Sequence, residues 1–153
     1  MSLNNIVNRQ YRNIVNKAAQ HTAGLDVPNE GWLATVRKAL GMSVVQLAAR
    51  RGVTRAQIAK LERTELQGSV TLGTMKKMAE AMGCRFVYSV VPDDRVETLI
   101  DQQARKKALK LVNKAGQHMA LEAQSLSTEL IHFEVKRVMQ ELKDKPPTDF
   151  WDD

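Results

Sequence analysis

Apolar residues recur at helical spacing through most of the chain, interrupted at a few glycine, proline and serine positions. Side chains three and four residues apart share one face of a helix, so this spacing predicts helices on both sides of residues 41–64. Their apolar stripes are Trp32, Leu33, Val36 and Leu40 before that segment, and Leu72, Met75, Met78, Ala79 and Met82 after it. Thr71 is placed to start the later helix, while Gly41 and Gly83 follow the two helices that they would end.

Between these helices, the sequence GMSVVQLAARRGVTRAQIAKLERT over residues 41–64 is typical of two short helices joined by a tight turn. Ser43 is a predicted cap for the first helix, Gly52 supplies the turn, and Thr54 is a predicted cap for the second. The residues expected where the two helices meet are small or apolar: Leu47, Ala48, Val53, Ile58 and Leu61. The layout is that of a helix-turn-helix motif.

The outward face of the second helix carries the candidate contacts to duplex DNA. Arginine and glutamine can make paired hydrogen bonds to base edges, and further lysines or arginines can neutralise phosphates. The expected base-contacting residues are Arg55, Ala56, Gln57 and Lys60, and the expected backbone contacts are Ser43, Gln46, Arg51, Thr54 and Arg63. The alternative is an ordinary helical hairpin whose exposed face is basic by chance, but the cap, turn and polar signals agree at one spacing.

The segments on either side of this domain have less specific patterns. Residues 3–21 predict an amphipathic helix, followed by a loop around Pro28. That helix carries Arg9, Arg12 and Lys17, and it either follows the DNA backbone or packs on its own subunit or on a second copy. The packing alternative is the one that we favour.

Residues 84–91, CRFVYSVV, alternate in a way that predicts the one strand of the chain, ended by Pro92. An unpaired strand leaves backbone donors and acceptors open, so we expect two chains to pair these strands through Phe86, Val87, Tyr88 and Val90. Such a homodimer would read an inverted-repeat operator with half-sites about 34 Å, or a multiple of that, apart. The alternative is a short edge segment folded against its own helices.

Residues 93–143 predict a long amphipathic helix with a bend or break near 124–128, where serine and threonine lower helix propensity. The tail PPTDFWDD then places Phe150 and Trp151 among carboxylates, either as a disordered end or as anchors for a partner. The expected domains are an N-terminal helix and loop (1–29), a helix-turn-helix domain (30–83), a dimerisation strand (84–92), a helical extension (93–145) and an acidic aromatic tail (146–153).

Composition narrows the class of protein. The 153 residues are 43% hydrophobic, enough for a real core. Residues 1–92 contain 13 Lys/Arg and 5 Asp/Glu, whereas residues 93–153 contain 10 Lys/Arg and 12 Asp/Glu. The basic first part is therefore expected to bind phosphate groups, and the mildly acidic second part is expected to bind protein. The apolar runs are too short for a membrane span, and no secretion signal is evident. With Cys84 as the single cysteine, a reducing cytoplasm is expected.

Nothing in the sequence indicates an enzyme. The three histidines are scattered, and there is no metal-ligand spacing, phosphate-binding glycine loop or nucleophile signature. We therefore expect no catalytic residues, no metal and no cofactor.

Residues 41–64 with their flanking helices resemble the Xre/Cro-like repressor domain. In that family an arginine of the first helix commonly pairs with a glutamate near the end of the recognition helix, and Arg37 and Glu62 occupy those positions. The resemblance implies that this pair is structural. The family often has a glutamine on the DNA backbone at the start of the second helix, and this chain has Val44 there.

Across nearly the whole chain, GWLATVRKALGMSVVQLAARRGVTRAQIAKLE, GSVTLGTMKKMAEAMGCRFVYSVVP, HMALEAQ and FWDD resemble the mobile mystery protein A family. This resemblance implies a DNA-binding protein of mobile elements, encoded beside a Fic-domain protein and acting as an antitoxin-like regulator. Separate-chain Fic inhibitors carry a Ser or Thr, three residues, then Glu followed by Gly or Asn. Ser125 and Glu129 match the first part, whereas Leu130 departs from it, and Ser125 equally fits a simple helix break.

These observations predict a mostly α fold: an Xre/Cro-like helix-turn-helix bundle with one C-terminal dimerising strand and a long helical C-terminal extension. The expected function is a sequence-specific transcriptional regulator, antitoxin-like partner of a Fic protein and autorepressor of its operon. The alternative is an interaction module that inhibits the Fic partner directly, with DNA binding secondary. Ser125, Glu129, Phe150 and Trp151 are the candidate partner contacts.

Overall fold

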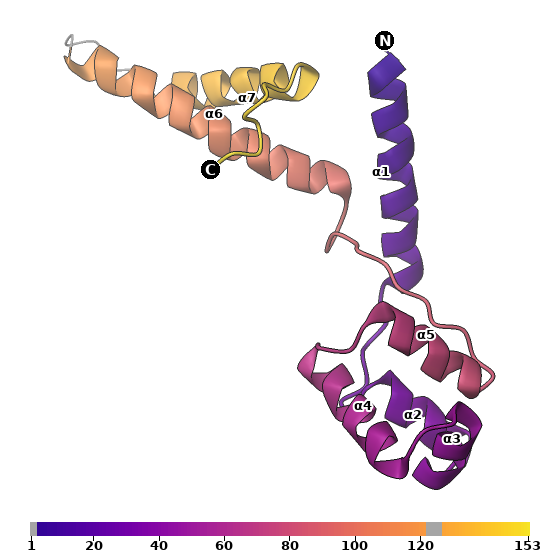
Figure 1. Ribbon diagram of the computed structural model, residues 1–153. Coiled ribbons are helices and arrows are strands. Elements are labelled where there is room, and N and C mark those ends of the chain that lie inside the picture. Colours follow the sequence, from indigo (N-terminus) through magenta and orange to yellow (C-terminus); the bar gives the residue numbers. More distant parts are fainter. Residues whose placement is uncertain (1–2, 122–126) are drawn as a thin grey trace. The chain divides into compact units, whose positions relative to one another are not determined.

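The computed structural model describes residues 3–121 and 127–153, and all regular secondary structure within them is helical (Figure 1). The helices are α1 (Leu3–Thr22), α2 (Trp32–Ala39), α3 (Val44–Arg51), α4 (Arg55–Gln67), α5 (Leu72–Ala81), α6 (Val96–Leu121) and α7 (Thr128–Asp144). The chain divides into two compact units, one of Gly24–Ser89 and the other of Met1–Ala23 with Val90–Asp153. Each unit is described by itself.

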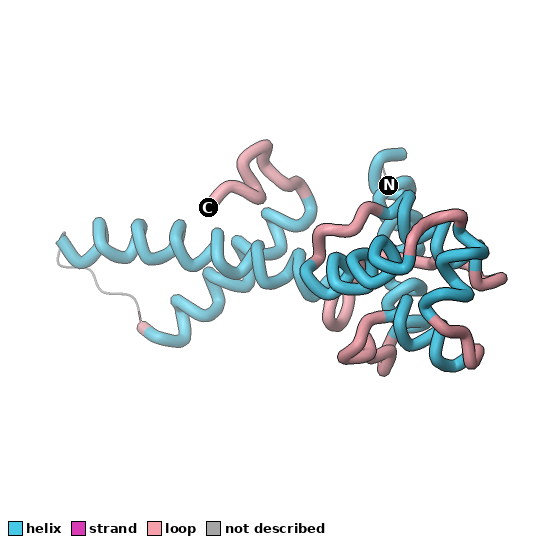
Figure 2. The backbone as a smooth tube through the Cα atoms, turned by 60° about the horizontal axis from the view of Figure 1, so that its bottom comes forward, coloured by secondary structure: helices cyan, strands magenta, loops and turns pink. Residues whose placement is uncertain are grey.

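The predicted dimerising strand is wrong. Residues 84–91 form a loop, and Figure 2 shows helix and loop only along the described chain. The alternation that suggested a strand does not correspond to a buried face: Phe86 packs against the core of the domain, whereas Val87, Tyr88 and Val90 are all exposed. A strand exists only as part of a hydrogen-bonded ladder, and the described part of the chain has no second strand for it. The dimer contact built on Phe86, Val87, Tyr88 and Val90 therefore loses its basis.

The Gly24–Ser89 unit is a four-helix bundle of α2 to α5, so the expected helix-turn-helix bundle is confirmed. Its buried core draws on every helix: Leu33 from α2, Leu47 and Ala48 from α3, Ile58 from α4, and Met75 and Met78 from α5, with Met82 just after it. Leu47, Ile58 and Met78 are fully buried. Burying one large apolar side chain stabilises a fold by about 1.5–3 kcal/mol, so these contacts hold the helices together.

In the other unit, α6 and α7 pack as a helical hairpin around Ala108, Val112 and Val135. α7 starts at Thr128 because the Ser127 hydroxyl accepts from the Leu130 N–H at 3.2 Å. The predicted break near 124–128 falls largely on residues 122–126, which lie outside the described residues. α6 ends before them and α7 starts after them.

α1 packs within the same chain through one buried polar side chain. Asn16, which is 8% exposed, accepts from the Val96 N–H at 2.9 Å and donates to Glu97 Oε2 at 2.8 Å. The Asn16 side chain thereby caps the first turn of α6 across 80 residues of sequence. The opposite face of α1 is exposed at Leu3, Tyr11 and Ile14.

The Asn16 contact predicts an acid-sensitive contribution to stability. Hydrogen bonds from the Asn16 amide and from its own backbone, with Arg95 nearby, lower the pKa of Glu97 from 4.5 to about 2. A depressed carboxylate pKa stabilises the fold above the unfolded value and is lost as pH falls through the folded value. Replacing Glu97 by Gln should therefore lower stability near pH 6, and this difference from wild type should vanish between pH 4.5 and 2.

Urea unfolding at a series of pH values measures this difference, with Glu80→Gln on α5 as a control carboxylate outside the contact. The side chain of Glu97 is 40% exposed, so water screens part of the effect. A Glu97→Gln difference that stays constant from pH 6 to 2 would contradict the assigned cause.

The C-terminal tail is folded onto α6. Phe150 is 4% exposed and stacks edge-on against Trp151, with ring centroids 5.1 Å apart. Gln103 Nε2 donates to the Phe150 carbonyl at 2.7 Å, and Lys106 pairs with Asp153. That ion pair holds the pKa of Asp153 below its usual value. The alternative of a disordered tail is therefore not what the structure shows.

Candidate nucleic-acid interface

The two helices of the motif, α3 and α4, begin with the same hydrogen-bonding arrangement. The Ser43 hydroxyl accepts from the Gln46 N–H at 3.1 Å, while Gln46 Oε1 accepts from the Ser43 N–H at 2.8 Å. Thr54 and Gln57 repeat this exchange at 3.2 and 2.8 Å. Such capping boxes satisfy backbone donors that the first turn leaves free, so both helices have defined starts.

The turn between α3 and α4 depends on Gly52. Its φ of 73° lies in the left-handed region, where a glycine carries no steric penalty. Its N–H and that of Val53 donate to the carbonyls of Ala49 and Ala48, which ends α3. The chain then re-enters a helix at Arg55 with a fixed direction.

The recognition helix, α4, separates its apolar and basic residues onto different faces. Ile58 is fully buried against the core, and Leu61 is partly buried beside it. The outward residues Arg55, Ala56, Gln57, Lys60 and Arg63 are all exposed. The sequence-predicted contacts on this helix therefore share one solvent-facing side, as base and phosphate contacts require.

Two glutamates on the inner side of α4 form hydrogen bonds to α2. Glu62 accepts from Arg37 Nε at 2.6 Å and from Arg37 Nη2 at 3.3 Å, and Arg37 Nη1 donates to the Met42 carbonyl at 3.1 Å. The side chains of Arg37 and Glu62 are 10% and 16% exposed. This geometry is that of a structural pair, and it removes both charges from the surface that meets solvent.

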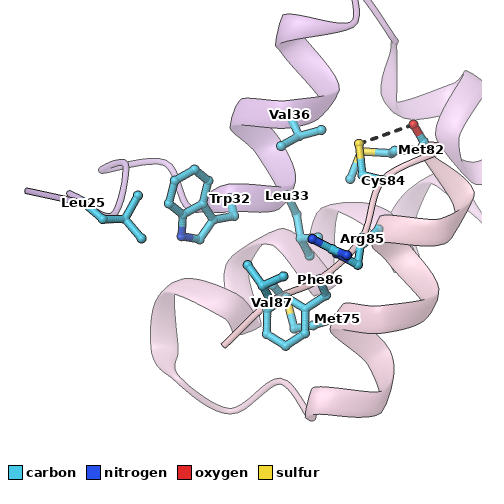
Figure 3. Close-up of a pocket in the computed structure, with 11 residues that line it drawn as sticks. Leu25, Trp32, Leu33, Val36, Met75, Met82, Cys84, Arg85, Phe86 and Val87 are labelled. Carbon is cyan, nitrogen blue, oxygen red and sulfur yellow. Dashed lines mark hydrogen bonds between the residues drawn. The ribbon is translucent and has the colours of Figure 1, made fainter. Parts of the chain in front are cut away.

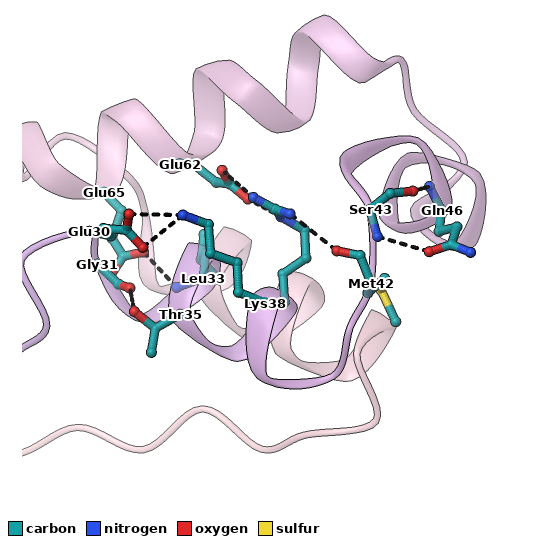
Figure 4. A network of polar contacts seen from close by, with 11 residues as sticks. Glu30, Gly31, Leu33, Thr35, Lys38, Met42, Ser43, Gln46, Glu62 and Glu65 are labelled. Carbon is teal, nitrogen blue, oxygen red and sulfur yellow. Dashed lines mark hydrogen bonds and ion pairs between the residues drawn. The ribbon is translucent and has the colours of Figure 1, made fainter.

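Glu65, one turn further along, performs a role that the sequence analysis missed. Its carboxylate accepts from the backbone N–H groups of Trp32 at 2.6 Å and Leu33 at 2.9 Å, so it caps the start of α2 (Figure 4). The residue before that helix, Gly31, has φ 84° and ψ 164° and no side-chain cap of its own. A Cβ on Gly31 would lie 2.9 Å from the Glu65 carboxylate. Glycine is what permits the carboxylate to reach the helix.

Two predicted contact residues already form hydrogen bonds within the protein through one of their side-chain groups. The carbonyl oxygens of Gln46 and Gln57 accept within their capping boxes, so their amide NH₂ groups are what they offer outward. A two-bond glutamine contact to adenine needs both the oxygen and the nitrogen. Gln57 therefore offers the donors of its NH₂ group, which is less than the paired donor-and-acceptor contact expected from sequence.

The two arginines at the end of α3 are also limited as DNA contacts, by a hydrogen bond in one case and by burial in the other. Arg50 Nε donates to the Ala81 carbonyl at 2.7 Å, which ties α3 to α5. Arg51, predicted as a phosphate contact, is half-buried, and its Nε is buried with no hydrogen-bond partner in the described structure. Arg63, by contrast, is exposed on the outward side of α4.

Electrostatics favour a polyanion on this unit. Residues 24–89 contain ten Lys/Arg and five Asp/Glu. Three of those five carboxylates are engaged within the unit: Glu62 with Arg37, Glu65 with α2, and Glu30 with Lys38 at 2.8 Å. The Lys38 pair lowers the pKa of Glu30. The exposed lysines and arginines therefore meet little opposing charge.

The candidate partner contacts differ in their exposure. Glu129 is exposed in the first turn of α7, whereas Ser125 lies outside the described residues. Phe150 is buried against its own chain, and Trp151 is 61% exposed. Of the three candidates that the structure describes, Glu129 and Trp151 are exposed.

Comparison with known proteins gives a match over this unit alone. Residues 33–89 match the family model described as Helix-turn-helix. No curated protein and no solved structure matched the chain. Within the described residues, no helix is both long and apolar enough to cross a membrane. The matched segment covers α2 to α5 together with the candidate interface, and it supports a DNA-binding regulator built on a helix-turn-helix domain.

Proposed function

We propose that this protein is a sequence-specific transcriptional regulator that reads duplex DNA with the outward face of α4. The observation that carries the proposal is the sorting of charge on that helix. Arg55, Lys60 and Arg63 are exposed, while Glu62 and Glu65 are bonded to α2 on the inner side. Such a helix can enter the major groove, because its exposed side presents hydrogen-bond donors and its carboxylates are already hydrogen-bonded to α2.

Each exposed residue has a proposed role. Arg55, in the first turn, is placed for a two-bond contact to a base, with Ala56 beside it for an apolar contact and Lys60 one turn later. Gln57 adds the donors of its NH₂ group. Ser43, Gln46, Thr54, Arg63 and the exposed part of Arg51 are the proposed phosphate contacts.

The proposal includes a homodimer on an inverted-repeat operator. Its support is the symmetry of this kind of motif, whose dimers bind half-sites about 34 Å, or a multiple of that, apart. The contact between the two copies is a surface other than paired strands at residues 84–91.

Arg55→Ala tests the base-reading role. Binding to the operator should weaken by about 1–3 kcal/mol, with little change on random DNA of the same length, because a base contact carries the sequence information. Arg63→Ala is the matched variant: it should weaken binding to both DNAs alike and flatten the salt dependence. Titrations by fluorescence anisotropy at several salt concentrations measure both effects.

Equal losses on both DNAs for Arg55→Ala would assign Arg55 to a phosphate. If wild-type protein shows no salt-dependent binding to any DNA from its own operon, the regulator proposal is wrong.

We further infer that the regulator represses its own operon as the antitoxin-like partner of a Fic-domain protein. The support for this step is the resemblance to the mobile mystery protein A family, together with the exposed residues of the rear unit. The alternative function, direct inhibition of the Fic protein with DNA binding secondary, is favoured by the accessible Glu129 and Trp151.

The recognition helix separates these two functions. In cells carrying the neighbouring Fic gene, Arg55→Ala should release toxicity if control acts through the operator, and it should leave toxicity controlled if inhibition is direct. Trp151→Ala should leave toxicity controlled if control acts through the operator. It should release toxicity if inhibition is direct, because the side chain would then be lost from the contact with the Fic protein. Binding of purified full-length variants to the Fic protein and to operator DNA, measured side by side, completes the test. No detectable complex with the Fic protein would remove direct inhibition.

A further inference from the structure

The Gly24–Ser89 unit has an apolar cavity on the side formed by α2, α5 and the loop after α5. The cavity volume is about 270 Å³. Trp32 and Val36 line it from α2, and Met75 from α5 (Figure 3). Phe86 and Arg85 close it from residues 84–87.

The cavity has the size of a ligand of one or two rings. An apolar cavity of about 150 Å³ already holds benzene, and pockets for drug-sized ligands begin near about 300 Å³. A peptide segment or helix is bound along an extended groove, whereas a volume of about 270 Å³ is that of a compact ligand. The size therefore favours a small molecule over a protein partner.

The charge at the cavity wall indicates what kind of small molecule would bind. Arg85 is the single charged residue among those that line the cavity, and no carboxylate accompanies it there. Within the described part of the chain its guanidinium has no hydrogen bond or ion pair, unlike Arg37 or Arg50. An unpaired guanidinium beside apolar walls is complementary to one carboxylate on an apolar body.

We propose that this cavity binds a small aromatic carboxylate, with the ring among Trp32, Met75 and Phe86 and the carboxylate on Arg85. Aromatic and thioether side chains are favourable neighbours for a ring. Leu33, Met75 and Met82 line the cavity and also belong to the core that holds Ile58 of α4, so an occupied cavity stabilises the bundle. The proposal stands independently of what α4 binds.

Trp32 and Cys84 report occupancy directly. The chain has two tryptophans, so Trp151→Phe leaves Trp32 as the single indole, and Cys84 at the cavity wall is the single cysteine. We would titrate this variant with 4-tert-butylbenzoate and, as the neutral match, 4-tert-butylbenzyl alcohol. The benzoate should give a saturable change in Trp32 fluorescence and slow the alkylation of Cys84 by iodoacetamide.

Arg85→Gln should weaken benzoate binding about tenfold, since a charge-assisted hydrogen bond is lost, and should change alcohol binding less than about twofold. Arg105→Gln removes an exposed charge from α6 and should change neither. No saturable change with either probe up to its solubility limit would overturn the cavity as a ligand site. Equal benzoate affinity in wild type and Arg85→Gln would overturn the carboxylate assignment. A fluorescence change that depends on protein concentration alone would show that a second copy fills the cavity, and would also overturn the proposal.

Discussion

Glu62→Ala is expected to lower the free energy of unfolding by about 3 kcal/mol, because it leaves the buried Arg37 guanidinium without its carboxylate. The remaining hydrogen bond of Arg37, to the Met42 carbonyl, does not neutralise the charge. A bundle of this size has a stability of only about 3–5 kcal/mol, so the variant should be close to unfolding. Urea unfolding followed by circular dichroism measures the loss.

The chain contains its own control for Glu62→Ala. Glu30 and Lys38 form an ion pair at 2.8 Å, with side chains 60% and 55% exposed, so Glu30→Ala should cost far less than Glu62→Ala because water screens the pair. The double variant Arg37→Met, Glu62→Leu should be more stable than Glu62→Ala, because it leaves no buried charge. Similar losses for Glu62→Ala and Glu30→Ala would mean that burial of the pair contributes nothing.

Gly31→Ala should be nearly as damaging, at about 3 kcal/mol, although it adds one methyl group. The backbone at φ 84° and ψ 164° is almost exclusive to glycine, and the new Cβ would push the Glu65 carboxylate away from the start of α2. Both the strain and the lost cap act in the same direction. Thermal and urea unfolding, with helix content followed by circular dichroism, measure the effect.

Two other glycines separate these causes. Gly41 has φ 65° and no atom within 4 Å of an added Cβ, so Gly41→Ala should cost about 1 kcal/mol from the backbone alone. Gly116 lies inside α6 with open space around it, and Gly116→Ala should stabilise the fold by about 0.5–1 kcal/mol. A Gly31→Ala loss no larger than that of Gly41→Ala would show that Glu65 does not matter.

Local signals made the helix-turn-helix domain readable from sequence. Ser43, Gly52 and Thr54 act on backbone groups within three residues of themselves, so residue type and spacing suffice to predict them. The buried face of α4 follows from apolar spacing alone. The family match over residues 33–89 covers the same segment.

Helix caps supplied by residues distant in the sequence could not be predicted from such local patterns. Glu65 caps α2 across 33 residues and Asn16 caps α6 across 80, and neither helix start carries a serine, threonine or aspartate that does the same work. The strand failed for a related reason. Phe86, Tyr88 and Val90 alternate along the sequence, but only Phe86 touches the core and the other two are exposed, and a strand would also require a partner ladder.

The capping box at the start of α4 bears on the operator itself. With the Gln57 oxygen turned back to the Thr54 N–H, the polar groups that α4 presents at Arg55, Gln57 and Lys60 are donors. Guanine offers two acceptors in the major groove, O6 and N7, whereas the exposed amino group of cytosine is a donor and would find nothing to accept it. The half-sites should therefore place guanine opposite Arg55 and Lys60, with a thymine methyl group near Ala56.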